Sequence, residues 1–79
     1  MTLKELVYVL DRETTVGIIN HNNELVLYTN VFTILMGDIG MNDTASYKTY
    51  LEIANMEVAD VVADKKNEIT IYIKKEGEI

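Results

Sequence analysis

Two hairpin patterns, one in each half of the chain, restrict its possible folds more than any other part of the sequence. In the second half, Ile69, Ile71 and Ile73 alternate with polar or aromatic side chains, the period of two that is typical of a half-buried strand. In the first half, His21-Asn22-Asn23 separates a β-branched run over residues 14–20 from the segment 24–29, and asparagine tolerates the positive φ angles of tight turns. We therefore predict two antiparallel hairpins. Their strands are residues 14–20 and 24–29 in the first, and 57–63 and 68–74 in the second.

Helical spacing precedes each hairpin. Leu3, Leu6, Val7 and Leu10 stand at the i, i+3, i+4, i+7 positions of one helical stripe. Thr2 and Glu5 ahead of this stripe fit a capping box, in which each side chain accepts a hydrogen bond from the other residue's backbone N–H. The same spacing recurs in Tyr47, Tyr50, Leu51 and Ala54, with Thr44 or Ser46 available as the N-cap. These patterns predict helices over residues 2–10 and 46–55.

The middle of the chain predicts a short helix and a loop. Residues 31–36 are apolar and lie between Asn30, a suitable N-cap, and Gly37, a suitable helix stop, so we expect one or two helical turns there. The turn-forming residues of 37–44 predict a loop, and the charged tail 75–79 is expected to fray.

These elements combine into one small α+β domain spanning residues 1–79, in the order αββ(α)αββ. We expect a four-stranded antiparallel sheet built from the two hairpins, with the helices on one face. The side chains expected to face the helices are Leu25, Leu27, Ile69, Ile71 and Ile73, and the helices supply Leu3, Leu6, Val7, Leu10, Tyr50 and Leu51. Strict alternation leaves Gly17, Ile19, Val26, Tyr28, Thr70 and Tyr72 on the opposite face.

The opposite face is apolar enough to need a cover. Either residues 31–41 fold back across it, or it is an association surface for another protein or a second copy of the chain. The third strand fits alternation least well, because Asp60 would share a face with Val58 and Val62. A bulge or an edge position would resolve that conflict.

The two halves also align at an offset of 44 residues without a gap. Asn23-Glu24-Leu25-Val26-Leu27-Tyr28 falls on Asn67-Glu68-Ile69-Thr70-Ile71-Tyr72. The alignment suggests an internal repeat of a helix-hairpin unit, or two units made alike by the same packing demands.

Composition excludes several classes of function. The chain has 79 residues, no cysteine, and 13 acidic against 7 basic side chains, for a formal charge of −6. The absence of cysteine removes disulfides, thiolate nucleophiles and thiolate zinc sites, and we expect a cytoplasmic location because no leader or membrane-span pattern is visible. The acidic balance disfavours direct binding to DNA or RNA, which depends on lysine and arginine.

Catalytic chemistry is sparse in this sequence. His21 is the one side chain that titrates near neutrality in its unperturbed form, and it lies in a predicted turn, where we expect it to be exposed. Gly37 and Gly40 form an isolated G-x-x-G with acidic neighbours, which is a poor phosphate site, and Asp38 and Asp43 lack the ligand spacing of a calcium loop. We therefore predict no catalytic residue, no cofactor and no metal.

The candidate binding residues are an acidic stretch and two tyrosines. Residues 38–64 hold six acidic side chains against one lysine, so most of the acidity lies in one third of the chain. This charge could simply keep the surface solvated, or it could engage a basic partner. The predicted partner-binding residues are Asp38, Asp43, Glu57, Asp60, Asp64, Tyr28 and Tyr72.

Three features of the chain together resemble a known group of proteins. They are the opening Met1-Thr2-Leu3-Lys4-Glu5-Leu6, the acidic composition and the final strand Ile69-Thr70-Ile71-Tyr72-Ile73. This group is the short accessory proteins of bacteriophages and mobile elements of low-GC Gram-positive bacteria. The resemblance implies a non-enzymatic protein-interaction module, such as an acidic inhibitor of a host defence nuclease of the anti-CRISPR or anti-restriction kind. Its partner would be a host or phage protein, including a nucleic-acid-binding one. The alternative is a self-associating structural or accessory protein that forms a homodimer.

Overall fold

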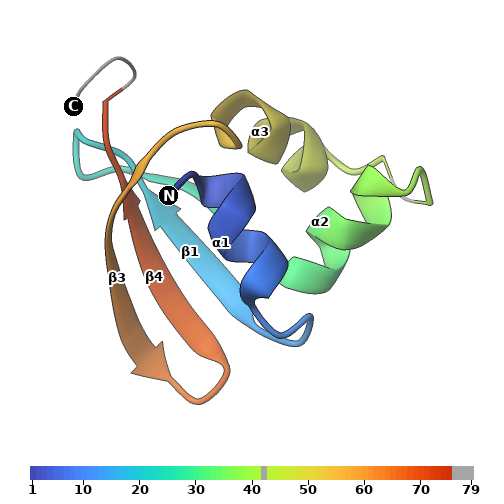
Figure 1. The fold of residues 1–79 in the computed structure, drawn as a ribbon, viewed down its shortest axis with the longest axis horizontal. Coiled ribbons are helices and arrows are strands. Elements are labelled where there is room, and N and C mark those ends of the chain that lie inside the picture. The colour runs from blue at the N-terminus through green and yellow to red at the C-terminus, as the bar shows by residue number, and fades with distance from the viewer. Residues whose placement is uncertain (42, 76–79) are drawn as a thin grey trace.

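The computed structural model describes residues 1–41 and 43–75. The helices are α1 (Leu3–Val9), α2 (Val31–Asp38) and α3 (Ala45–Ile53), and the strands are β1 (Thr15–Ile19), β2 (Leu25–Asn30), β3 (Val58–Lys65) and β4 (Glu68–Ile73). This order confirms the predicted α+β arrangement, including a helix after the first hairpin. Figure 1 shows α1 in front of the sheet, with α2 and α3 beside it.

The four strands form one sheet in the order β2-β1-β4-β3. Both predicted hairpins are antiparallel, as expected. The prediction of a wholly antiparallel sheet is corrected at the centre, where β1 and β4 are neighbours and run parallel. This pairing sets Val16 beside Ile69 and Ile18 beside Ile71. The mixed sheet is favoured because it places the alternating isoleucines of β4 in the middle of the molecule, where they lose most contact with water.

Asparagines shape both hairpin turns. Asn23 has φ 62° and Asn67 has φ 61°, the left-handed conformation that asparagine adopts more readily than most residues. In the first turn, the Asn20 side-chain carbonyl also accepts hydrogen bonds from the backbone N–H groups of Asn22 (2.9 Å) and Glu24 (3.0 Å). The turns therefore form from local interactions that the sequence carries by itself.

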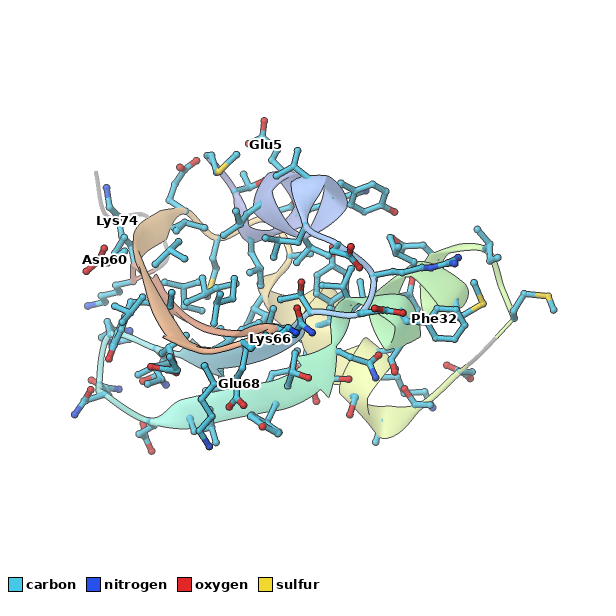
Figure 2. All side chains as sticks on the ribbon, turned by 90° about the horizontal axis from the view of Figure 1, so that it is seen from below. Glu5, Phe32, Asp60, Lys66, Glu68 and Lys74 are labelled. Carbon is cyan, nitrogen blue, oxygen red and sulfur yellow. The ribbon has the colours of Figure 1, made fainter. Side chains whose placement is uncertain are left out.

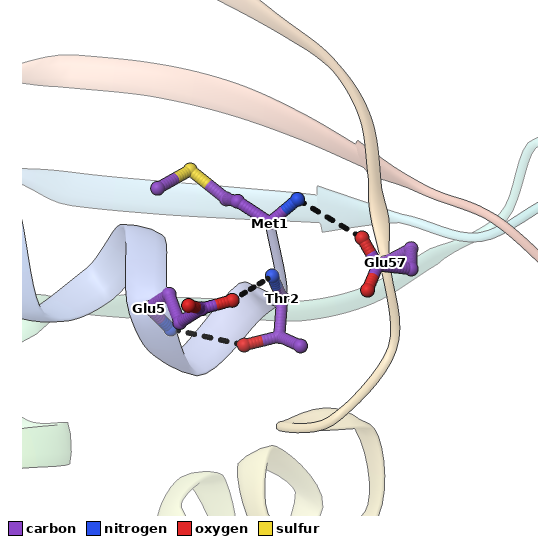
Figure 3. A network of polar contacts seen from close by, with 4 residues as sticks. All are labelled: Met1, Thr2, Glu5 and Glu57. Atoms are coloured by element: carbon purple, nitrogen blue, oxygen red, sulfur yellow. Dashed lines mark hydrogen bonds and ion pairs between the residues drawn. The ribbon is translucent and has the colours of Figure 1, made fainter.

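The start of α1 is capped as predicted and is tied to β3 (Figure 3). The Thr2 backbone N–H donates to Glu5 Oε1 at 2.7 Å, and the Glu5 N–H donates to Thr2 Oγ1 at 3.2 Å. The Met1 amine lies 3.0 Å from Glu57 Oε2, and the Val58 N–H donates to the Met1 carbonyl at 2.9 Å. The first residues therefore cover the beginning of the outer edge of β3.

The helices α2 and α3 begin at the expected caps. Asn30 Oδ1 accepts from the Thr33 N–H at 2.8 Å, and Thr44 Oγ1 accepts from the Tyr47 N–H at 3.1 Å. However, α2 continues to Asp38 instead of stopping at Gly37, and Gly40 takes the left-handed conformation (φ 78°) instead. In the predicted loop 37–44, residue 42 lies outside the described residues, as does the predicted tail beyond residue 75.

A single core lies between the helices and one face of the sheet, as predicted. All three helices contribute to it, so they cover the same face. The buried apolar residues are Leu3, Val7, Val16, Ile18, Leu27, Val31, Ile34, Tyr50, Ala54, Ile71 and Ile73.

Three residues depart from the predicted faces. A register shift between Ile18 and Ile19 makes Val26 an extra residue in β2, so Leu25 lies away from the helices and is 62% exposed. Val26 correspondingly packs against the core instead of the opposite face. Leu51 is 54% exposed, because α3 turns the stripe that contains Tyr50 and Ala54 toward the core.

Asp60 was predicted to need either a bulge or an edge position, and the structure has both. The strand β3 is an edge strand, and register shifts occur between Val58 and Asp60 and between Ala63 and Lys65. Val58 therefore packs against the core, while Asp60 and Val62 lie on the opposite face.

The internal repeat remains a prediction. At the offset of 44, β2 corresponds to β4, but β2 lies at an edge of the sheet and β4 lies at its centre. The two helix-hairpin units thus occupy non-equivalent positions in the sheet.

Candidate functional site

The sheet face that points away from the helices is the candidate site, and we call it the open face. Its exposed side chains include Leu25 (62% exposed), Tyr28 (56%) and Val62 (41%). Residues 31–41 do not fold across it, because α2 buries Val31 and Ile34 in the core on the other side of the sheet. By strand register, the open face includes Thr15, Gly17, Ile19, Leu25, Tyr28, Asp60, Val62, Lys65, Glu68, Thr70 and Tyr72.

Tyr28, on the edge strand β2, extends its ring across this face toward β1 and β4. A methyl group added to Gly17 would lie 3.5 Å from Cδ1 and 4.0 Å from Cε1 of the Tyr28 ring, so the ring reaches over β1 at Gly17. Beyond β1, the Tyr28 hydroxyl donates a 3.0 Å hydrogen bond to Glu68 Oε1 on β4. This hydrogen bond raises the pKa of the Tyr28 phenol. The hydroxyl end of the ring is thus held by Glu68, and the residue is still more than half exposed.

Tyr72, the second predicted tyrosine, shares the open face with Tyr28. It lies beside Ile19 in the ladder, two rows along from the Tyr28–Gly17–Thr70 row and on the same face. Unlike Tyr28, it is half-buried. The structure therefore brings the two predicted tyrosines to one surface, with Tyr28 as the more accessible of the two.

Three carboxylates lie on the open face or reach it: Asp60 and Glu68 by register, and Asp64 through its contact with Thr70. Asp60 accepts from the Val61 N–H at 2.9 Å, Asp64 accepts from the Thr70 hydroxyl, and Glu68 accepts from Tyr28. All of these donors are neutral. In the described part of the chain the ion pairs join Met1 to Glu57 and Lys48 to Asp43, so none of the three carboxylates has a cation within 4.0 Å. In Figure 2, Glu68 lies on the side of the sheet away from α1.

The other three predicted acids do not gather at one place. Glu57 is paired with the Met1 amine, and Asp43 lies 3.9 Å from Lys48 Nζ on α3. Asp38 is engaged within the molecule by two tyrosines. Of the acidic stretch, the structure therefore brings only Asp60 and Asp64 to the open face, together with Glu68, which the sequence analysis did not select.

A tyrosine cluster around Asp38 was also missed by the sequence analysis. The Asp38 carboxylate accepts hydrogen bonds from the Tyr8 hydroxyl of α1 and from the Tyr47 hydroxyl of α3, the latter at 2.6 Å. The bond to Asp38 raises the pKa of Tyr47 to about 12. The Tyr47 ring stacks on Tyr50 with centroids 6.1 Å apart. No local sequence pattern predicts this cluster, because its members come from three different helices.

The Asp38 cluster joins helices and offers little to a ligand. Tyr50 is only 1% exposed, and its hydroxyl has no hydrogen-bond partner in the described part of the chain. Burial raises the pKa of this phenol, so it is neutral at physiological pH. The cluster therefore acts as a polar clamp between α1, α2 and α3.

The rest of the described surface holds little chemistry. His21 is exposed in its turn, as expected. A wide-open hollow of about 540 Å³ is lined by Arg12, Glu13, Asn30 and Phe32, which include no nucleophile beside a base. Among the described residues, no three His, Cys, Asp or Glu side chains are grouped as metal ligands, and no helix has the length and hydrophobicity of a membrane span.

The open face is therefore the surface on which a functional argument can rest. Its anchored aromatic ring and unneutralised carboxylates suit non-covalent binding. In comparisons with known proteins, no family model, curated protein or solved structure matches this chain.

Proposed function

We propose that this chain is a non-enzymatic protein-binding module of the phage or mobile-element type, and that the open face is its binding surface. The observation that carries the proposal is Tyr28, whose ring reaches over Gly17 and is held by Glu68 through its hydroxyl, yet whose side chain is 56% exposed. Tyrosines dominate binding energy at protein interfaces, since they bury a large area and lose little conformational freedom. A ring that is already ordered loses even less on binding.

The charges at the open face favour a basic protein as the partner. Asp60, Asp64 and Glu68 form no ion pair within 4.0 Å in the described residues, although Lys65 lies opposite Glu68 in the ladder, and the chain as a whole carries −6. A second copy would bring the same carboxylates and the same net charge, so charge complementarity favours a different, basic protein. A nucleic-acid-binding protein fits this description, because its surface for phosphates is basic. An inhibitor of a host nuclease would act in this way by covering the basic channel of the enzyme.

The test compares two variants that carry the same added charge. Tyr28→Lys with Tyr72→Lys alters the open face, and Val9→Lys with Leu51→Lys alters α1 and α3 at side chains that are 73% and 54% exposed. Tagged wild-type and variant chains are used to capture binding proteins from lysate of a candidate host, after circular dichroism has shown that each is folded. We expect the captured partner to be lost with the open-face variant and retained with the helix variant.

Two further measurements separate the remaining explanations. Raising the salt from about 0.05 to 0.5 M should weaken the complex, because screening shortens the reach of the carboxylates. Static light scattering on the isolated chain tests the second-copy alternative. The wild-type chain could prove to be a dimer that the double substitution Tyr28→Lys, Tyr72→Lys converts to a monomer. In that case the open face would bind a second copy of the chain, and the proposal of a basic partner would be wrong. Equal capture by both variants would refute the open face as the binding surface.

A further inference from the structure

We infer that the open face recognises an arginine side chain of the partner, held between the Tyr28 ring and the Glu68 carboxylate. The inference rests on the proposed function and adds the chemistry of the contact. The observation behind it is an exposed aromatic ring beside a carboxylate that has no cation within 4.0 Å in the described residues.

The position of Tyr28 leaves part of its side chain available. Ring atoms Cδ1 and Cε1 lie toward Gly17 of β1, where an added Cβ would be 3.5 and 4.0 Å away, and glycine places no side chain between the ring and the sheet. The residue is nevertheless 56% exposed, so part of the side chain remains open to solvent. A guanidinium group stacks on such a surface, with favourable interaction when the cation lies within about 6 Å of the ring centre.

Glu68 supplies the charge at the end of this ring. Oε1 of Glu68 accepts a hydrogen bond from the Tyr28 hydroxyl at 3.0 Å, and among the described residues Oε2 accepts none. Lys65 lies directly opposite Glu68 in the ladder, yet its ammonium group does not approach to ion-pair distance. A guanidinium above the ring can therefore direct an N–H toward Glu68, and its planar fork allows stacking and hydrogen bonding at the same time.

The neighbouring carboxylates select for a basic segment and against nucleic acid. Asp64 is hydrogen-bonded to Thr70, two residues along β4 from Glu68 and on the same face, and Asp60 lies opposite Tyr72. A nucleic acid could stack bases on Tyr28, but its phosphates would meet these carboxylates. An arginine-bearing protein segment gains from both the ring and the acids. Lysine gains less, because its compact and strongly hydrated ammonium group does not stack.

The test is an NMR titration of the full chain with short synthetic peptides. The probe is a blocked pentapeptide with two arginines among glycines, and the comparison peptides carry lysine or the uncharged arginine analogue citrulline at the same positions. We expect the arginine peptide to shift backbone amides around Gly17, Tyr28 and Glu68, with an affinity about threefold above that of the lysine peptide and with no saturable binding of the citrulline peptide.

Variants of the chain then locate the contact. Glu68→Gln keeps an oxygen that can accept a hydrogen bond from the Tyr28 hydroxyl but removes the charge. We expect it to weaken binding of the arginine peptide about threefold. Tyr28→Leu should do the same by removing the ring. Glu52→Gln is the matched control on α3, where the acid is exposed and distant from the sheet face, and it should leave the titration unchanged.

The outcomes distinguish this inference from the proposed function. Equal affinities for the arginine and lysine peptides, or an unchanged affinity in Glu68→Gln, would overturn the arginine contact. If the partner is nevertheless lost in the Tyr28→Lys, Tyr72→Lys capture experiment, the open face stands as a binding surface with another chemistry. If capture is also unaffected, both proposals fail together.

Discussion

Replacement of Gly37 by alanine tests the packing between α2 and α3 with a single methyl group. A Cβ at this position would lie 2.6 Å from Cε1 of the Tyr47 ring, and closer still to Cδ1 and Cγ. Carbon atoms prefer about 3.5–4.0 Å, so the ring would have to move by about 1 Å or more. The Tyr47 hydroxyl is 2.6 Å from Asp38 Oδ1, and a displacement of that size would break the hydrogen bond.

The expected loss of stability follows from these distances. Overpacking costs about 1–3 kcal/mol, and loss of a hydrogen bond to a charged group adds about 1 kcal/mol at a half-exposed site. The better helix propensity of alanine offsets at most about 1 kcal/mol. We therefore expect a net loss of about 2 kcal/mol for Gly37→Ala. A chain of 79 residues has a free energy of unfolding of about 4–12 kcal/mol, so this is a large fraction, equivalent to a fall in Tm of about 8–16 °C.

Thermal and urea unfolding followed by circular dichroism measure this effect. Gly17→Ala is the matched control, because its new methyl group would meet Tyr28 at 3.5 Å, an ordinary contact, and it should change the stability by less than about 0.5 kcal/mol. In a Tyr47→Ala background the penalty of Gly37→Ala should vanish, since the obstructing ring is gone. A penalty that persists in that background, or a Gly37→Ala variant as stable as wild type, would refute the packing argument.

Two further predictions concern the phenols of the Asp38 cluster. The raised pKa of Tyr47, about 12, means that the unfolded chain loses this proton near pH 10 while the folded chain retains it. Stability should therefore be insensitive to this group below pH 10 and fall as the pH rises from 10 to 12. Phenolate absorbance should show a component titrating near 12 that Tyr47→Phe removes, whereas ionisation of all five tyrosines near pH 10 would contradict the assignment. Tyr50→Phe should raise the free energy of unfolding by about 1 kcal/mol, because it removes a buried hydroxyl without a partner in the described residues. A marked destabilisation in the same unfolding assay would show that this hydroxyl is bonded in solution.

The sequence by itself determined the local elements of this protein. The Thr2–Glu5 capping box, the asparagine turns and the period-two isoleucines all appear where they were predicted, and the helix after Asn30 begins at its expected cap. Each depends on atoms only a few residues apart, so the sequence pattern carries the physical cause directly. The shared face of Tyr28 and Tyr72 follows from the same alternation.

Tertiary structure decided which distant groups meet. The parallel pairing of β1 with β4, the extra residue at Val26 and the meeting of Tyr8 with Asp38 depend on packing across the whole chain. Asp38 and Glu68 look equivalent as acidic surface residues in the sequence, yet the fold turns Asp38 into a clamp between helices and sets Glu68 beside an exposed ring. The reason is that strand order and helix placement minimise exposed apolar area globally, and no local pattern encodes that minimum.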